Sequence, residues 1–429
     1  MSRIDADLVA EENDRRRVHH GRDLDHLVGS LAARGVDAEG VIAALAEFEV
    51  AVPSWALGTG GTRFGRFPIG GEPRTTEEKI DDTAALHALT AANPRVSLHV
   101  PWDLPPDPAA LRDYAEERGI GFDAMNSNTF QDDPRTTRGG EVSWKFGSLA
   151  NADPKVREAA VEHNLAVVDL GVELGSSALT VWLADGTNHP GQASFRRQFE
   201  RVAEGLRRIH DHLPDGWTLL VEHKPYEPAF YSSVNTDWGS SLLLAQEAGP
   251  RTRCIVDLGH HLPNTNIEQV VSRLAMVGRL GGFHFNDSKY GDDDLTTGSI
   301  KPFQLFLIMM ELLEAGDGVL PELAYMIDQS HNLKDPLEDL LQSTEALQLA
   351  LAQALVVDRA ALIEAQEAND PARAAEVLMD GFRTDVRPLV AEARRRGGGA
   401  LELVATYRAA GYRAQAIAER GRDAQATGL

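Results

Sequence analysis

Eight short apolar runs recur along residues 48–350, and a stretch with helical periodicity separates each run from the next. An alternation of apolar strands and helices is typical of a parallel sheet covered by helices, and eight such units are the number that closes a (β/α)8 barrel. The sequence therefore predicts an α/β fold, a (β/α)8 TIM barrel. The expected strands are 48–57, 95–100, 120–125, 178–183, 217–222, 253–257, 281–286 and 322–328.

An open, doubly wound sheet is the competing architecture, and two observations oppose it. The polar residues of an open sheet gather near one switch point, whereas here they end many different strands. No glycine-rich dinucleotide fingerprint or phosphate-binding loop follows the first strand in the required context. We therefore expect the barrel. The residues at these strand ends are His99, Trp182, Glu222, Asp257, His284 and Asp328.

The segments on either side of the expected barrel read as helices. We expect an N-terminal helical segment over 1–47, a catalytic barrel over 48–350 and a C-terminal helical extension over 351–429, where Ala, Arg, Glu and Leu replace the strand signals. Helices appended to a barrel commonly pack on a neighbouring subunit, so the extension predicts a homo-oligomer. The alternative is a helical clasp on its own barrel.

Charge and cysteine content exclude several classes of protein. Lys and Arg number 42 and Asp and Glu number 65, so the net charge is −23. Such a chain repels phosphate backbones and anionic membranes, and we expect neither nucleic acid nor membrane as a partner. Cys254 is the single cysteine, which rules out an internal disulfide and fits a reducing compartment. With no apolar core of a signal peptide near the N-terminus, the expected location is cytoplasmic.

Residues 254–294 gather Asp and His where two apolar runs end. The first run closes as CIVDLGHH and the second continues as GGFHFNDSKYGDDD. Strand alternation turns His284 toward the barrel mouth and its two phenylalanine neighbours toward the helices. Each of these motifs alone has a structural explanation. The first could be a capping Asp with a solvated His, His284 could be a core histidine, and the acidic run could be a solvated turn.

The fifth and eighth expected strands add further charged groups. In VEHK, Glu222 and Lys224 lie two apart and point to the same face, and an inward charge without a partner is costly. A structural ion pair is the alternative for these two, and a helix cap is the alternative for Asp328. The candidate metal ligands on this one face are Glu222, Asp257, His260, His284, Asp292, Asp294 and Asp328.

Five carboxylates and two imidazoles indicate a site for divalent cations. Mixed His and carboxylate ligands favour Mn²⁺, Co²⁺ or Zn²⁺ over Ca²⁺, with Mg²⁺ as a further candidate. Seven ligands are enough for two ions that share a carboxylate. We expect two divalent cations per subunit, with Mn²⁺ first.

Aromatic side chains beside these polar groups suit a sugar, because rings stack on its C–H faces while its hydroxyls take hydrogen bonds. Core packing is the alternative for any single aromatic residue. The glycine-rich loop 58–67 lacks the Lys-Ser/Thr of a phosphate loop, so we expect a mobile lid. The expected substrate-binding residues are Trp55, Phe64, His99, Trp102, Phe130, Trp182 and Lys224.

Seven motifs give the chain a family resemblance over nearly its whole length. The chain resembles the L-rhamnose isomerases of the broad-specificity bacterial type, within the xylose isomerase-like barrel superfamily. The matching motifs are SWALGTGGTRFGRF (54–67), LHVPWD (98–103), VWLADG (181–186), VEHKPYEPAFY (221–231), DLGHHLPNTNIE (257–268), FHFNDSKYGDDDL (283–295) and MIDQSHN (326–332).

The resemblance implies a role for each ligand. A structural ion would be held by Glu222, Asp257, His284 and Asp328, and a catalytic ion by His260, Asp292 and Asp294 with Asp257 bridging. Lys224 would lie beside the substrate oxygen nearest C1, and His99 beside the ring oxygen during ring opening. The expected catalytic residues are Lys224, Asp292, Asp294, His99 and Asp328. The resemblance also implies a homotetramer, in which the 58–67 loop reaches a neighbour's pocket.

The reaction implied is the isomerisation of L-rhamnose to L-rhamnulose, with broad aldose specificity. Ring opening would precede a metal-assisted hydride shift from C2 to C1, and an enediol route with a protein base is the mechanistic alternative. Two other classes stay open: a metallo-hydrolase barrel such as an abasic-site endonuclease, and a non-catalytic sugar-binding protein. The net charge of −23 opposes the endonuclease.

Overall fold

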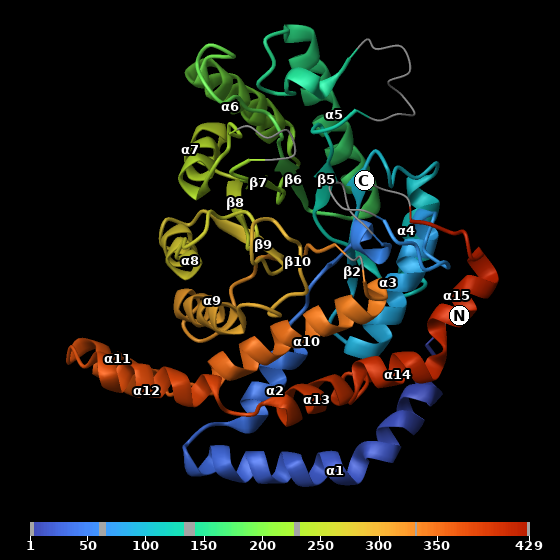
Figure 1. The fold of residues 1–429 in the computed structure, drawn as a ribbon, viewed down its shortest axis with the longest axis vertical. Coiled ribbons are helices and arrows are strands. Elements are labelled where there is room, and N and C mark those ends of the chain that lie inside the picture. The colour runs from blue at the N-terminus through green and yellow to red at the C-terminus, as the bar shows by residue number, and fades with distance from the viewer. Residues whose placement is uncertain (1–3, 60–65, 133–141, 227–231, 331–332, 427–429) are drawn as a thin grey trace.

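The strands form a closed parallel barrel (Figure 1). The computed structural model describes residues 4–59, 66–132, 142–226, 232–330 and 333–426. Ten strand segments fill eight positions, since the second and third positions are each broken in two. The segments are β1 (Val52–Pro53), β2 (Arg95–Ser97), β3 (His99–Val100), β4 (Gly121–Phe122), β5 (Met125–Ser127), β6 (Ala178–Trp182), β7 (Thr218–Glu222), β8 (Thr252–Asp257), β9 (Leu280–Phe285) and β10 (Ala324–Ile327).

The first and last strands close the barrel. Parallel pairing runs from β10 through β9, β8, β7, β6 and β5 to β3, and separately from β1 through β2 to β4. Ala51, just before β1, joins the two sheets: its N–H donates to Tyr325 O at 2.8 Å, and its carbonyl accepts from Ile327 N at 3.1 Å. The barrel expected from the eight-fold alternation is confirmed, and the open sheet is excluded.

Helices follow the strands in alternation and cover the outside of the barrel. Several begin where the sequence supplies a cap. Asp107, Asp153 and Asp335 each accept a backbone N–H at a helix start, and a proline follows each of them in the first turn. The covering helices are α3 (Thr76–Thr90), α4 (Pro108–Glu116), α5 (Pro154–Leu174), α6 (Phe195–His212), α7 (Trp238–Ala248), α8 (Ile267–Met276), α9 (Pro302–Ala315) and α10 (Pro336–Leu355).

The two faces of β9 show how alternation builds the core. Phe283 and Phe285 stack with ring centroids 5.1 Å apart and pack outward under the helices, as the sequence predicts. On this strand a Cβ on Gly282 would come within 2.2 Å of Ala324 O on β10, so glycine permits the close approach of the two strands. His284 lies between the two phenylalanines and therefore faces the barrel interior.

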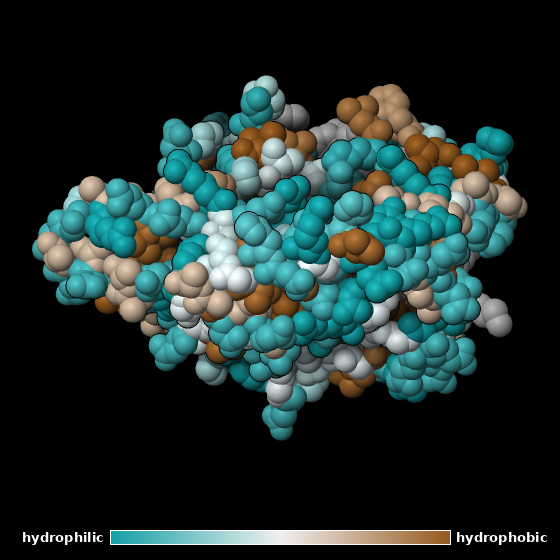
Figure 2. Space-filling view, turned by 90° about the horizontal axis from the view of Figure 1, so that it is seen from below, coloured by the Kyte–Doolittle hydropathy of each residue, from teal (hydrophilic) through white to brown (hydrophobic). Residues whose placement is uncertain are grey.

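The terminal segments form a layer of helices on one side of the barrel (Figure 1). α13 packs against α1, α2 and α10, and α14 packs against α1, α3 and α10. The face that this layer presents is largely hydrophilic (Figure 2). The helices thus clasp their own barrel, and their part in subunit contacts stays a prediction. The layer consists of α1 (Ala6–Ala33), α2 (Ala38–Ala46), α11 (Arg359–Glu367), α12 (Pro371–Phe382), α13 (Arg387–Arg396), α14 (Leu403–Ala410) and α15 (Tyr412–Arg420).

No described helix is by itself long and apolar enough to cross a bilayer. α10 and α11 reach that length and composition only when they are taken together across a 63° bend.

Candidate metal centre

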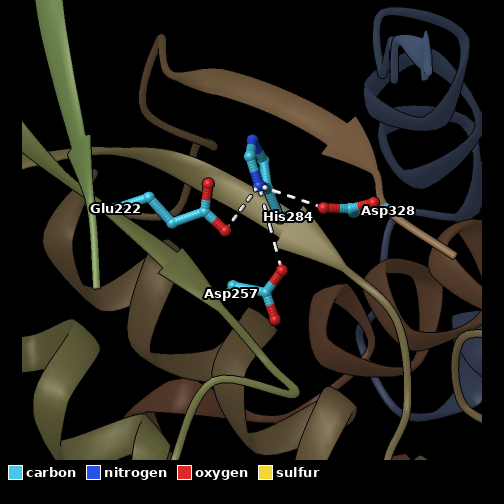
Figure 3. A group of neighbouring side chains, drawn as sticks. All are labelled: Glu222, Asp257, His284 and Asp328. Atoms are coloured by element: carbon cyan, nitrogen blue, oxygen red, sulfur yellow. Dashed lines mark ion pairs between the residues drawn. The ribbon is translucent and has the colours of Figure 1, made fainter. Parts of the chain in front are cut away.

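Four side chains meet where the last four strand positions end. Glu222 and Asp257 are the final residues of β7 and β8, His284 is the penultimate residue of β9, and Asp328 follows β10. Because parallel strands end at the same edge of a barrel, these residues share one mouth. Figure 3 shows the three carboxylates turned toward one ring nitrogen of the histidine.

The distances within this group suit a divalent cation. His284 Nδ1 lies 3.1 Å from Glu222 Oε1, 3.4 Å from Asp328 Oδ2 and 3.8 Å from Asp257 Oδ2 (Figure 3). Ligands about 2.1 Å from a tetrahedral cation lie roughly 3.3 to 3.6 Å from one another. Among the described residues, His284 Nδ1 and Asp257 Oδ2 are buried and have no partner in hydrogen-bond geometry. The donor set therefore fits a cation better than a hydrogen-bonded cluster.

A second group shares Asp257 with the first. One ligand atom from each of Asp257, His260 and Asp292 lies within 4.8 Å of the other two. His260 Nε2 lies 3.2 Å from Asp292 Oδ2, while its Nδ1 lies 3.0 Å from Glu222 Oε1. The imidazole of His260 therefore stands between the two groups.

The turn after β8 fixes the orientation of Asp257. Its Oδ1 accepts from the backbone N–H of Gly259 at 2.7 Å, from that of His260 at 3.2 Å and from Asn286 Nδ2 at 3.0 Å. These donors occupy one carboxylate oxygen. The other, Oδ2, is left to face both ligand groups, which is the arrangement that a bridging carboxylate needs.

Burial and mutual repulsion shift the pKa values of the cluster. Burial raises the pKa of Asp257 to about 7, and although His260 opposes this rise, the neighbouring carboxylate of Glu222 adds to it. Burial alone would lower the pKa values of His260 and His284, but the carboxylates around them hold both well above the usual value for histidine. Without a cation, the cluster therefore holds protons that a cation would displace.

Lys224 lines the cavity beside the ligand groups. It is buried, its ammonium contacts the carboxylate of Asp292, and its Nζ lies 5.1 Å from the centre of the Trp182 ring. Glu222 and Lys224 thus share the inward face, as their spacing predicts. Trp55 Nε1 donates to Asp328 Oδ1 at 2.8 Å, which links the aromatic wall to a ligand carboxylate.

A cavity of about 90 Å³ adjoins the ligands. The rings of Trp55 and Phe130 pack against His99, with ring centroids 5.3 and 5.7 Å from its own, and Phe130 meets Trp182 edge-on at 4.2 Å. Burial lowers the pKa of His99 to about 4, so its ring is neutral near pH 7. The mouth thus combines an aromatic wall, a neutral imidazole and a cluster of acids.

Three expected site residues stand apart from this arrangement. Trp102 contacts His99 and Phe130 at centroid distances of 4.9 and 6.4 Å but is absent from the cavity lining. Asp294 lines the cavity, yet its Oδ2 accepts from Ser330 Oγ at 3.1 Å and it belongs to neither ligand group. Phe64 and most of the expected lid lie outside the described residues.

Four polar lining residues were not expected from the sequence: Asn126, Ser127, Thr180 and Ser330. Thr180 lies two residues before Trp182 on β6, so alternation placed it on the same face. Asn126 and Ser127 end β5, beyond the boundary expected at residue 125. In the sequence, these two residues form a polar pair directly after an apolar run, and this pattern could have identified them.

Comparisons with known proteins agree with this geometry. Residues 87–330 match the family described as xylose isomerase-like TIM barrel. A probable sugar isomerase of Rhizobium meliloti is 52% identical over 97% of this chain and 96% of its own length, and a xylose isomerase of Thermus thermophilus is 25% identical over 61% of this chain and 68% of its own.

A solved structure of an L-ribulose 3-epimerase superposes with a TM-score of 0.53 at 16% identity, covering 74% of this chain and 99% of that one, and so supports the fold alone. The family match covers more than half of the chain, and the Rhizobium meliloti relative aligns with nearly all of it. The chain belongs to the xylose isomerase-like TIM barrel family.

Proposed function

We propose that the protein is a metal-dependent aldose–ketose isomerase that converts L-rhamnose to L-rhamnulose and accepts other aldoses. The observation that carries the proposal is the pair of ligand groups joined at Asp257, beside a cavity with an aromatic wall and the buried Lys224. The similarity to a probable sugar isomerase of Rhizobium meliloti supports the same class of reaction.

We assign the first cation to Glu222, Asp257, His284 and Asp328. The second would use His260 and Asp292, share Asp257, and take Asp294 from the cavity wall. Mn²⁺ is the first choice because the donors mix imidazole with carboxylate, and Co²⁺, Zn²⁺ and Mg²⁺ are alternatives. A divalent cation in such a site supplies Lewis acidity toward the sugar oxygens, which favours a hydride shift between C2 and C1.

Side chains of the protein carry out the remaining steps of the reaction. His99, with its neutral ring, accepts the proton of the O1 hydroxyl and donates a proton to the ring oxygen, O5, so that the ring opens. Lys224 donates to the oxygen nearest C1, where negative charge develops. A water molecule oriented by Asp292 or Asp294 carries the proton between O2 and O1. Trp55, Phe130 and Trp182 cover the apolar face of the sugar and exclude water.

Two further assignments belong to this proposal. The enzyme acts in the cytoplasm on a small sugar, with neither nucleic acid nor membrane as a partner, as the charge of −23 favours. It assembles as a homotetramer, an assignment that rests on the family resemblance of the sequence motifs.

A panel assay tests the proposal. Enzyme stripped with EDTA is reconstituted with Mn²⁺, Co²⁺, Zn²⁺ or Mg²⁺ and supplied with L-rhamnose, L-mannose, L-lyxose, D-allose or D-psicose. We expect metal-dependent isomerisation, fastest with L-rhamnose and Mn²⁺. Cleavage of abasic duplex without sugar turnover would favour a metallo-hydrolase, and sugar binding without turnover would favour a binding protein. L-Rhamnose deuterated at C2 should keep its label on C1 of the product, whereas loss of the label to solvent would indicate the enediol route.

A further inference from the structure

A second and larger cavity lies at the opposite end of the barrel from the metal centre. Its volume is about 500 Å³. The end of α2, the residues leading into β1 and β2, and the loop between α9 and β10 form its wall. These are the amino-terminal ends of the strands, so the cavity opens at the floor of the barrel. It shares no lining residue with the cavity at the mouth.

Part of the wall of this floor cavity is apolar. Phe48, Val50, Leu313 and Leu351 line it and are themselves buried. Cavities of about 300 to 1,000 Å³ with such walls are the size that binds small organic molecules. The volume therefore suits a compact ligand with an apolar body.

Asp123 supplies a polar anchor within this apolar wall. It lies between β4 and β5 and lines the cavity, and among the described residues its buried Oδ2 has no hydrogen-bond partner. Burial raises the pKa of this carboxyl, against the attraction of Arg95. Arg95 is itself paired with Glu49 at 3.2 Å. A buried carboxylate oxygen without a partner is costly, and a purely structural aspartate would be expected to have one.

The charged residues around the opening of the floor cavity are mostly acidic. Glu47, Glu49 and Glu322 are exposed in the lining, and Arg95 is the single basic residue among the lining residues, all of which the structure describes. This balance attracts cations and repels anions. The lining thus combines an acidic rim, several buried apolar side chains and the carboxyl group of Asp123.

We propose that the floor cavity binds a small organic cation, with an ammonium or guanidinium group at Asp123 and an apolar chain along Val50 and Leu351. The site is separate from the metal centre and does not depend on the isomerase assignment. Its occupant stabilises the floor of the barrel, because a ligand that binds only the folded state raises the stability of that state.

Three probes with one apolar body and different head groups test the site. The full chain, loaded with Mn²⁺, is titrated with n-hexylamine, 1-hexanol and hexanoate by calorimetry. We expect the amine to bind about tenfold or more tightly than the alcohol, because a charged hydrogen-bonded group outweighs a neutral one, and hexanoate to bind most weakly. The proposal would be overturned if the three probes bound with equal affinity, or if none of the three bound.

Two variants locate the binding to this cavity. Asp123→Asn keeps the size of the side chain and should remove the preference for the amine while leaving 1-hexanol unchanged. Ala44→Phe fills the cavity and should weaken both probes. Asp113→Asn removes an exposed carboxylate from α4 and should change nothing. Melting curves confirm that each variant is folded, and sugar turnover, measured in parallel, should be unchanged. An amine affinity that survives Asp123→Asn would contradict the assignment.

Discussion

Two regions of the molecule that bury acidic side chains satisfy them differently. Where α15 meets the barrel, Asp82 is fully buried and accepts from Arg420 Nη1 at 2.9 Å, from Arg420 Nη2 at 2.7 Å and from Tyr412 Oη at 2.5 Å. Asp335 is held in the same way by Arg413, at 2.8 and 2.7 Å, and by a tyrosine. In this region arginine side chains of the protein itself neutralise the buried acids.

At the barrel mouth the balance is reversed. Five carboxylates face Lys224 and two imidazoles, and Asp257 Oδ2 has no hydrogen-bond partner among the described residues. The two regions differ in the groups that neutralise their acids. Arginine completes a structural contact in the first, whereas the excess of acid in the second indicates a site that could hold an external cation.

The largest effect is expected at the shared carboxylate. Asp257→Asn removes the bridging oxygen, and we expect kcat/KM for L-rhamnose to fall by about 10³-fold or more while the fold is kept. Initial rates with Mn²⁺ measure the loss, and circular dichroism checks the fold. Asp123→Asn, an identical change at the barrel floor, is the matched control and should leave the rate unaffected. Activity within tenfold of the wild type would remove Asp257 from the site.

The next effect concerns stability. Arg420→Met leaves Asp82 buried without its cation, and we expect the free energy of unfolding to fall by about 3–5 kcal/mol with no change in Mn²⁺ affinity. Denaturant melts and metal titration measure the two quantities. The double variant Asp82→Leu, Arg420→Met removes the charge as well as its partner and should recover much of the loss. If the single variant weakened metal binding, the two regions would not be independent.

A smaller effect follows from the protons held at the mouth. The raised pKa values of Asp257, His260 and His284 mean that protons bind this cluster more tightly than ordinary side chains, and a cation must displace them. Mn²⁺ affinity should therefore rise as the pH increases toward and through about 7, by up to one logarithmic unit per pH unit for each proton displaced. Calorimetry in buffers of different ionisation enthalpy counts the protons. A Mn²⁺ affinity that does not change with pH would contradict these raised pKa values.

The smallest effect is expected at the aromatic wall. Trp55→Phe keeps an apolar ring but loses the hydrogen bond from Nε1 to Asp328 Oδ1. We expect kcat/KM to fall by about 3- to 10-fold, the equivalent of one ordinary hydrogen bond. A loss as large as that of Asp257→Asn would mean that the tryptophan does more than orient a ligand.

The sequence predicted most of the residues at the barrel mouth, but it did not predict the contacts that hold the terminal helices against the barrel. Period-two alternation placed Glu222, Lys224 and His284 inward, because side-chain direction in a strand depends only on neighbours in sequence. Asp82 and Arg420 are 338 residues apart, and no local pattern marks two residues that meet only in the folded chain. Element ends were also imprecise: β5 ends at Ser127 rather than at the expected residue 125.

The number of metal ions bound per chain decides whether the barrel mouth holds two cations. Enzyme stripped with EDTA is titrated with Mn²⁺ by calorimetry, and the bound metal is counted by elemental analysis after dialysis. The arrangement around Asp257 predicts two ions per chain in the wild type and a reduced count in Glu222→Gln. A wild-type protein that retains no Mn²⁺, or a Glu222→Gln protein that binds it unchanged, would contradict the account.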